Sequence, residues 1–129
     1  MSNEPSQSYV YADINKNATL PCLAFDEVME MNETYAFVNW YLKSHNGIDS
    51  SWKWFAGMNK FGKTKAQKGY NISNVDGSLF IDKARPLDVR EFLCKVERIN
   101  GRPPNTHLVT LRLRENGEQF DIFILVFVF

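Results

Sequence analysis

The 129-residue sequence contains two cysteines and two histidines and lacks any block of like charge. Two cysteines alone cannot hold zinc, and neither His45 nor His107 has a companion ligand at metal-binding spacing, so no metal or other cofactor is expected. Both histidines are predicted to be solvated loop or strand residues. Fifteen basic side chains balance fifteen acidic ones, which leaves no net field to attract nucleic acid.

Catalytic motifs are also missing from the sequence. It has no nucleophile beside a base and an orienting group, no paired carboxylates on one wall and no glycine-rich phosphate cradle. We therefore predict that the chain is not an enzyme.

Long apolar runs are absent as well. The longest, FDIFILVFVF at 120–129, is roughly half the length of a membrane span and contains Asp121. It fits either the first half of a transmembrane helix or an extra strand. The opening residues, MSNEPSQS, lack the apolar core of a signal peptide. Either a leader has been removed, or an extracellular location is the wrong interpretation.

Three asparagines stand in N-x-S/T triplets: Asn17, Asn32 and Asn71. Single triplets arise often by chance, but three in one short chain favour a glycosylated, extracellular or cell-surface protein. That compartment is oxidising, so Cys22 and Cys94 should be joined there.

Apolar residues recur with period two in short runs separated by Gly, Asn, Asp, Ser and Pro, which predicts an all-β sandwich or barrel. The only helical signal is a single turn in KARPLDVRE. We expect one domain at 8–116, an N-terminal tail at 1–7 and an apolar C-terminal segment at 117–129. The predicted strands are 8–12, 18–24, 35–43, 51–57, 70–73, 78–82, 91–98 and 108–114, with an uncertain one at 61–66.

Cys22, then Trp40 in AFVNWYLK, then Cys94 in DVREFLC resemble the Cys, Trp, Cys order of immunoglobulin-superfamily domains. The resemblance covers roughly 9–115 and implies a sandwich of two antiparallel sheets, with a buried Trp packed on a disulfide between the sheets. About 50 residues separate Trp40 from Cys94, enough for the additional edge strands of the V type.

The stretch SLFIDKARPLDVREFLC is similar to the family's segment from strand E to strand F. The resemblance implies that Leu79 and Ile81 face the core, and that Asp88 pairs with a basic residue, for which Lys68 is the nearest candidate. Phe92 stands where the family has a tyrosine, so it can fill the core, but a hydrogen bond of about 1 kcal/mol must be absent.

The strand-G region, NTHLVTLRLRE, lacks the F-G-x-G of rearranged antigen receptors. The stretches NETYAFVNWYLKS and FAGMNKFGK instead resemble integrin-associated protein, the membrane ligand of signal-regulatory proteins, and its viral mimics. Ile14 stands where that group has a cysteine that ties the domain to its membrane part, so this tether would be missing. Butyrophilin-like costimulatory ligands stay open as an alternative.

Alternation assigns the outer face of the sheet that holds family strands G, F and C. In strand C, Val38, Trp40 and Leu42 share the inward parity. The outward residues mix aromatic and charged side chains, as binding patches do, although a few exposed apolar residues are ordinary on any sheet. With the hairpin ERINGRPPNT, the predicted partner-binding residues are Phe37, Tyr41, Lys95, Glu97, Arg98, Arg102 and Arg112.

Parity also places Asn17 outward and Asn71 near strand D, so sugars there would cover the other sheet, while Asn32 would lie at one end of the sandwich. The face that Trp52 and Trp54 occupy stays undecided. We expect a heterophilic binding domain of a cell-surface or viral protein whose partner is another surface protein, such as an immunoglobulin-like receptor. A homophilic adhesion or structural module is the alternative.

Overall fold

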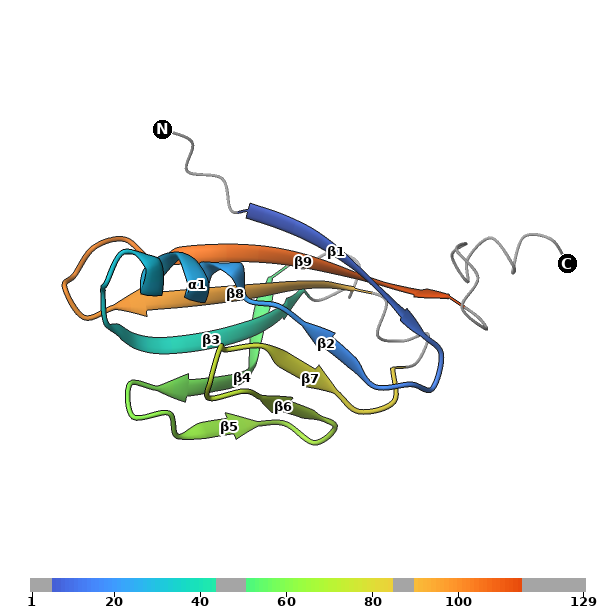
Figure 1. Cartoon of the computed structure of the whole chain (residues 1–129). Helices are drawn as coiled ribbons and strands as arrows, with labels where there is room; N and C mark the ends of the chain where they lie inside the picture. The colour runs from blue at the N-terminus through green and yellow to red at the C-terminus, as the bar shows by residue number, and fades with distance from the viewer. Residues whose placement is uncertain (1–5, 44–50, 85–89, 115–129) are drawn as a thin grey trace, which may run out of the picture.

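The computed structural model describes residues 6–43, 51–84 and 90–114. Two β-sheets form a sandwich: a six-stranded sheet in the order β1-β9-β8-β3-β4-β5, and a three-stranded sheet in the order β2-β7-β6 (Figure 1). β1 pairs with β9 in parallel, and the other neighbours are antiparallel. The elements are β1 (Ser6–Asp13), β2 (Ala18–Leu20), α1 (Leu23–Glu30), β3 (Tyr35–Lys43), β4 (Trp52–Asn59), β5 (Thr64–Ala66), β6 (Tyr70–Ile72), β7 (Leu79–Ile81), β8 (Glu91–Arg98) and β9 (Asn105–Arg114).

Side chains that alternate between the core and the outer face build two central strands of the larger sheet, β8 and β9. In β8, Phe92 and Val96 are fully buried while their chain neighbours are partly exposed. The same alternation runs the length of β9 and buries Leu111 and Leu113. From the smaller sheet, Leu79 faces the same core, as predicted. Burial of one face of each sheet is what holds the two layers together.

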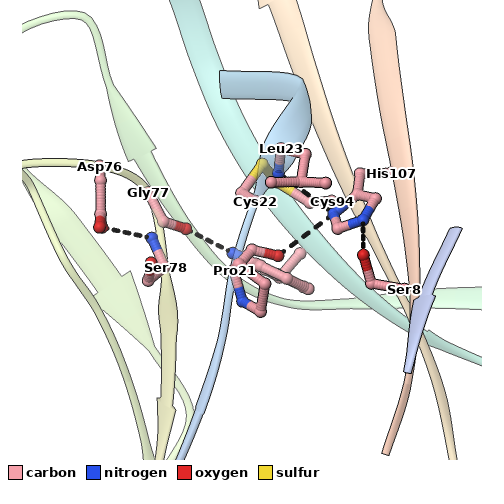
Figure 2. Close-up of a disulfide and its surroundings, with 10 residues drawn as sticks. Ser8, Pro21, Cys22, Leu23, Asp76, Gly77, Ser78, Cys94 and His107 are labelled. Atoms are coloured by element: carbon pink, nitrogen blue, oxygen red, sulfur yellow. Dashed lines mark hydrogen bonds between the residues drawn. A yellow bond between two sulfur atoms is a disulfide. The ribbon is translucent and has the colours of Figure 1, made fainter. Parts of the chain in front are cut away.

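The disulfide joins Cys22 to Cys94 with a Cα–Cα distance of 5.9 Å, as the sequence predicts (Figure 2). Trp40 of β3 lies directly opposite Cys94 in the sheet and is fully buried. Its indole Nε1 donates a hydrogen bond of 2.9 Å to the Gly77 carbonyl, which satisfies the one polar group of this side chain inside the core. Cys22, Cys94, Trp40 and Phe92 therefore form the predicted centre of the sandwich.

The prediction of a strand through 18–24 is wrong at its second half. β2 ends at Leu20, and the helix α1 begins directly after Cys22. Ala24, Phe25 and Val28 are buried, which is the spacing of a helical face and not of a strand. α1 lies at one end of the sandwich, near the connection between β8 and β9 (Figure 1).

Some sequence predictions fall outside the described residues. These are the pairing of Asp88 with Lys68, the helical turn in KARPLDVRE for the most part, and the apolar segment 117–129. Ser6 and Gln7, which were assigned to a tail, lie in β1. Within the described ranges, no helix is both long enough and apolar enough to cross a bilayer.

The prediction that His107 is solvated is also wrong, because this side chain is fully buried. Figure 2 shows it beside the disulfide, where three elements meet. Nδ1 lies 3.1 Å from the Leu23 backbone nitrogen and 3.2 Å from the Pro21 carbonyl oxygen, and Nε2 lies 2.8 Å from the Ser8 hydroxyl oxygen. The His107 imidazole thus links β9 to the start of α1 and to β1.

Acidification is expected to destabilise the domain through His107. Burial is the main factor that holds the pKa of this imidazole below its usual value, while contacts with Pro21, Glu27 and Asp26 act in the opposite direction. The unfolded chain therefore binds a proton that the folded chain rejects, and stability is lost as pH falls below about 6.5, the pKa of an exposed histidine.

Urea unfolding between pH 7.5 and 5.5 would check this expectation. The unfolding midpoint should fall with pH in the parent protein, and it should change less in His107→Gln, which cannot gain a proton. Equal pH dependence in both proteins would show that other groups are responsible.

Candidate partner-binding face

The outer face of β9, β8, β3 and β4 is the candidate site, and we call it the candidate face. Its strand parity agrees with the sequence prediction: in β3, Val38 is fully buried and Phe37 is 49% exposed. Residues that lie opposite one another across the strands point to the same side. On this side lie Phe37, Asn39, Tyr41 and Lys43 of β3, Leu93, Lys95 and Glu97 of β8, and Thr110, Arg112 and Arg114 of β9.

Aromatic side chains occupy the β3–β4 part of the candidate face. Tyr41 lies opposite Trp54 on one side and Leu93 on the other, and these neighbours leave it only partly exposed. Burial, and secondarily the carboxylate of Glu97, raise the pKa of the Tyr41 hydroxyl. Phe37 and Trp54 are more open, at 49% and 43% exposure, and are therefore better placed to enter a partner.

The structure settles the orientation of the two tryptophans, which the sequence left undecided. Trp54 lies opposite Tyr41 and Trp52 lies opposite Lys43, so both belong to the candidate face. The Lys43 ammonium stands 6.0 Å from the centre of the Trp52 ring, at the limit of a cation–π contact. These tryptophans extend the aromatic surface from β3 onto β4.

A close approach between β3 and β4 holds Trp54 in place. Its indole Nε1 donates to the Asn39 side-chain oxygen at 2.8 Å. Gly57 leaves room for this bond, because a Cβ atom there would stand 2.3 Å from the same oxygen and 3.0 Å from the Val38 carbonyl. The exposed tryptophan is thus fixed by a hydrogen bond and loses less side-chain entropy on binding.

A hollow of about 580 Å³ lies between these aromatic residues and the start of β5. Phe37 and Trp54 line it together with Lys63, Lys65 and Glu97. An aromatic hollow with charges at its margin is the combination found where proteins contact one another.

The charged residues that the sequence predicts on β8 lie on the candidate face, where two of them form an ion pair with each other. Lys95 and Glu97 are 3.9 Å apart, and their side chains are partly exposed, at 34% and 44%. An exposed ion pair of this kind is worth at most about 1 kcal/mol. Both groups can therefore exchange partners at low cost.

The connection between β8 and β9 is the hairpin ERINGRPPNT, and it turns at Asn100-Gly101. Gly101 adopts φ +76°, a left-handed conformation that glycine accepts without strain, and the Arg102 N–H donates to the Asn100 side-chain oxygen at 3.0 Å. Arg102 is 64% exposed at the tip, where it can meet a partner.

Arg98 has a different environment from the one the sequence suggested. It ion-pairs with Glu33 at 3.1 Å, and the two side chains are only 11% and 14% exposed. Arg98 also donates to Asn105, which donates in turn to Glu27 of α1 at 2.9 Å. Arg102 reaches the other oxygen of Glu33 at 2.9 Å. Arg98 therefore anchors the hairpin to the helix end, and we do not propose it as a partner contact.

Glu33→Gln is expected to lower the free energy of unfolding by about 2 kcal/mol. It removes the negative charge on which Arg98 and Arg102 converge, and a nearly buried arginine without its counter-charge is costly. The Asn32 glycosylation triplet survives this change, because its middle position accepts any residue except proline. Urea unfolding beside Glu30→Gln, a change at an exposed carboxylate of α1, measures the effect. A cost no larger than that of the control would contradict it.

The three glycosylation triplets divide between two places. Asn17, just before β2, and Asn71 in β6 are exposed on the outer face of the three-stranded sheet. Asn32 follows α1 with φ +57° and lies with Ile99 and Asn100 around one hollow beside the β8–β9 connection. A sugar on Asn32 would therefore stand near the predicted binding loop.

Sequence reasoning missed α1, the buried His107 and Glu33. The helix had a signal in LAFDEVME, where buried residues recur at helical spacing with Asp26 in the first turn. In the residues that the structure describes, no three His, Cys, Asp or Glu side chains gather where they could hold a metal ion.

The layered sheets, the disulfide and the tryptophan packed at its centre define an immunoglobulin V-type fold. Solved structures with this fold are similar to the chain. Tim-1 is 19% identical, with a TM-score of 0.66 over 91% of this chain and all of the other. Tim-4 in complex with phosphatidylserine is 17% identical, with a TM-score of 0.60 over 83% and 98%. CD84 of the SLAM family is 11% identical, with a TM-score of 0.62 over 88% and 100%.

These identities support the fold and no finer relationship. No protein-family model matches the sequence, and no curated protein sequence matches it. The resemblance to integrin-associated protein is not shown by these comparisons and stays a prediction from the sequence.

Proposed function

We propose that the chain is an extracellular immunoglobulin-like domain of a cell-surface or viral protein that binds another surface protein through the candidate face. The single observation that carries this proposal is the exposed, hydrogen-bonded aromatic surface around Phe37 and Trp54. It is bordered by a hollow and by exchangeable charges. Large aromatic anchors surrounded by polar groups dominate the energetics of protein interfaces.

Two further observations support the proposal. Glu33 ties the β8–β9 connection to the segment between α1 and β3, so the exposed Arg102 is presented by a loop with few conformations to lose. Asn17 and Asn71 lie on the opposite sheet, which leaves the candidate face clear of sugars at those positions.

Surface plasmon resonance against signal-regulatory proteins and other surface V-type domains tests the proposal. Specific binding to one of them, weakened by Trp54→Ala and unchanged by Phe80→Thr on the opposite sheet, is the expected result. Equal loss with both variants, or binding that survives Trp54→Ala, would place the interface elsewhere.

Sedimentation at micromolar concentration separates this function from homophilic adhesion. The proposed heterophilic domain should remain monomeric. Self-association that Trp54→Ala abolishes would favour the adhesion module instead.

A further inference from the structure

The outer face of the three-stranded sheet carries a single large exposed aromatic side chain at its centre. Phe80 is 41% exposed in the middle of β7, while its neighbours Leu79 and Ile81 are buried on the core side. β7 lies between β2 and β6, so Phe80 has a residue beside it on each side.

Both of those neighbouring residues belong to glycosylation triplets. Thr19, the third residue of the Asn17 triplet, pairs with Phe80 from β2. Asn71 pairs with Phe80 from β6. Asn17 and Asn71 also line one hollow of about 480 Å³ together with Phe80. Directly opposite residues of this kind have Cβ atoms about 5 Å apart, within reach of the first sugar of a glycan.

Hydrogen bonds from the backbone of other residues orient the side chains of Asn71 and Asn17. The Asn71 amide oxygen accepts the Ile72 N–H at 2.9 Å, and that of Asn17 accepts the Lys83 N–H at 3.1 Å. In each case the side-chain oxygen accepts a hydrogen bond. The side-chain amide nitrogen, to which an N-glycan attaches, points away from that bond. Both residues are exposed.

We propose that the first N-acetylglucosamine of a glycan on Asn71 packs its apolar face on the Phe80 ring, so that Phe80 is a sugar-binding residue for the domain's own glycan. The inference rests on the extracellular location proposed above. Sugar C–H groups and an aromatic face bury apolar surface when they pack together. The pairing of β6 with β7 holds Asn71 beside Phe80, so the sugar and the ring are kept close to one another. The exposed phenylalanine is thereby covered on the outer face of the three-stranded sheet.

Asn32 provides a matched control because it lies beside Ile99 and Asn100, away from β7. The protein would be produced in a glycosylating eukaryotic host, and mass spectrometry would establish which asparagines carry sugar. Absence of sugar on every asparagine would overturn the extracellular location and this inference with it. Sugar on Asn32 or Asn17 but not on Asn71 would overturn this inference alone.

Thermal melts of a double-mutant cycle test the contact itself. Asn71→Gln is expected to lower the melting temperature by about 2–4 °C when Phe80 is present and by less than about 1 °C in a Phe80→Thr background. Asn32→Gln should have the same effect in both backgrounds. Equal effects of Asn71→Gln with and without Phe80 would overturn the proposal.

Trimming the glycan to its first sugar gives an independent readout. In protein from a host that adds high-mannose glycans, endoglycosidase H leaves one N-acetylglucosamine on each glycosylated asparagine, so the stabilisation at Asn71 should survive trimming. Ring-current shifts of that sugar's protons should be visible by NMR and vanish in Phe80→Thr. Loss of the stabilisation on trimming, or unshifted sugar protons, would show that the first sugar does not contact Phe80.

Discussion

Replacing Cys22 and Cys94 together by alanine is expected to lower the free energy of unfolding by about 4 kcal/mol. The bridge spans 72 residues, and closing a loop of that length removes much of the conformational entropy of the unfolded chain. Domains of this size are stable by only about 5–15 kcal/mol, so the loss is a large part of the total. Both sulfur atoms also lie in the core next to Trp40 and His107.

Urea unfolding of the parent and the double variant measures this loss. Thiol titration of the unreduced, unfolded parent is the accompanying control and should detect no free sulfhydryl. Two free thiols, or a variant within about 1 kcal/mol of the parent, would contradict the structural role of the bridge.

Phe37→Ala is expected to weaken binding of the surface partner by about 2 kcal/mol, or roughly 30-fold in Kd, mainly through faster dissociation. The side chain is half exposed at the margin of the hollow, so its removal should shift the melting temperature by only a few degrees. Surface plasmon resonance beside thermal melts measures both quantities. Unchanged binding, or unfolding of the variant, would contradict the assignment.

Tyr41→Ala should behave differently from Phe37→Ala, although parity places both on the candidate face. Tyr41 is partly buried between Trp54 and Leu93, so its truncation should cost stability as well as affinity. Parity alone predicts an equal and small effect on stability. The comparison of the two variants therefore separates the direction of a side chain from its burial.

Lys95, Glu97, Arg102 and Arg112 are the charged residues that we propose as contacts at the margin of the interface. Neutralising one of them should change mainly the association rate and its salt dependence, since exposed charges steer encounter more than they stabilise the bound state. Arg98 should not behave this way, because Glu33 holds it inside the domain.

Features that depend on a local pattern of residues were predictable from the sequence. Period-two alternation assigned the inward residues of β3, β8 and β9, and the order Cys22, Trp40, Cys94 indicated the sandwich and its bridge. These predictions held because a strand's side chains alternate whatever its neighbours are, so parity requires no knowledge of the partner strand. The length and order of the elements then left few arrangements open.

Contacts between residues that lie far apart in the sequence became apparent in the folded structure alone. A helix follows Cys22 where the sequence predicted the second half of a strand. It forms there because Ala24, Phe25 and Val28 pack into the core at the end of the sandwich. The burial of His107 depends on elements far away in the chain.

The same holds for the pairing of Arg98 with Glu33 and for the position of Phe80 between two glycosylation triplets. Strand register and ion pairing bring together residues that are far apart in the sequence. Such contacts cannot be predicted from a local sequence pattern. A charged or aromatic residue therefore reveals from sequence which way it points, while the packed fold decides what it touches.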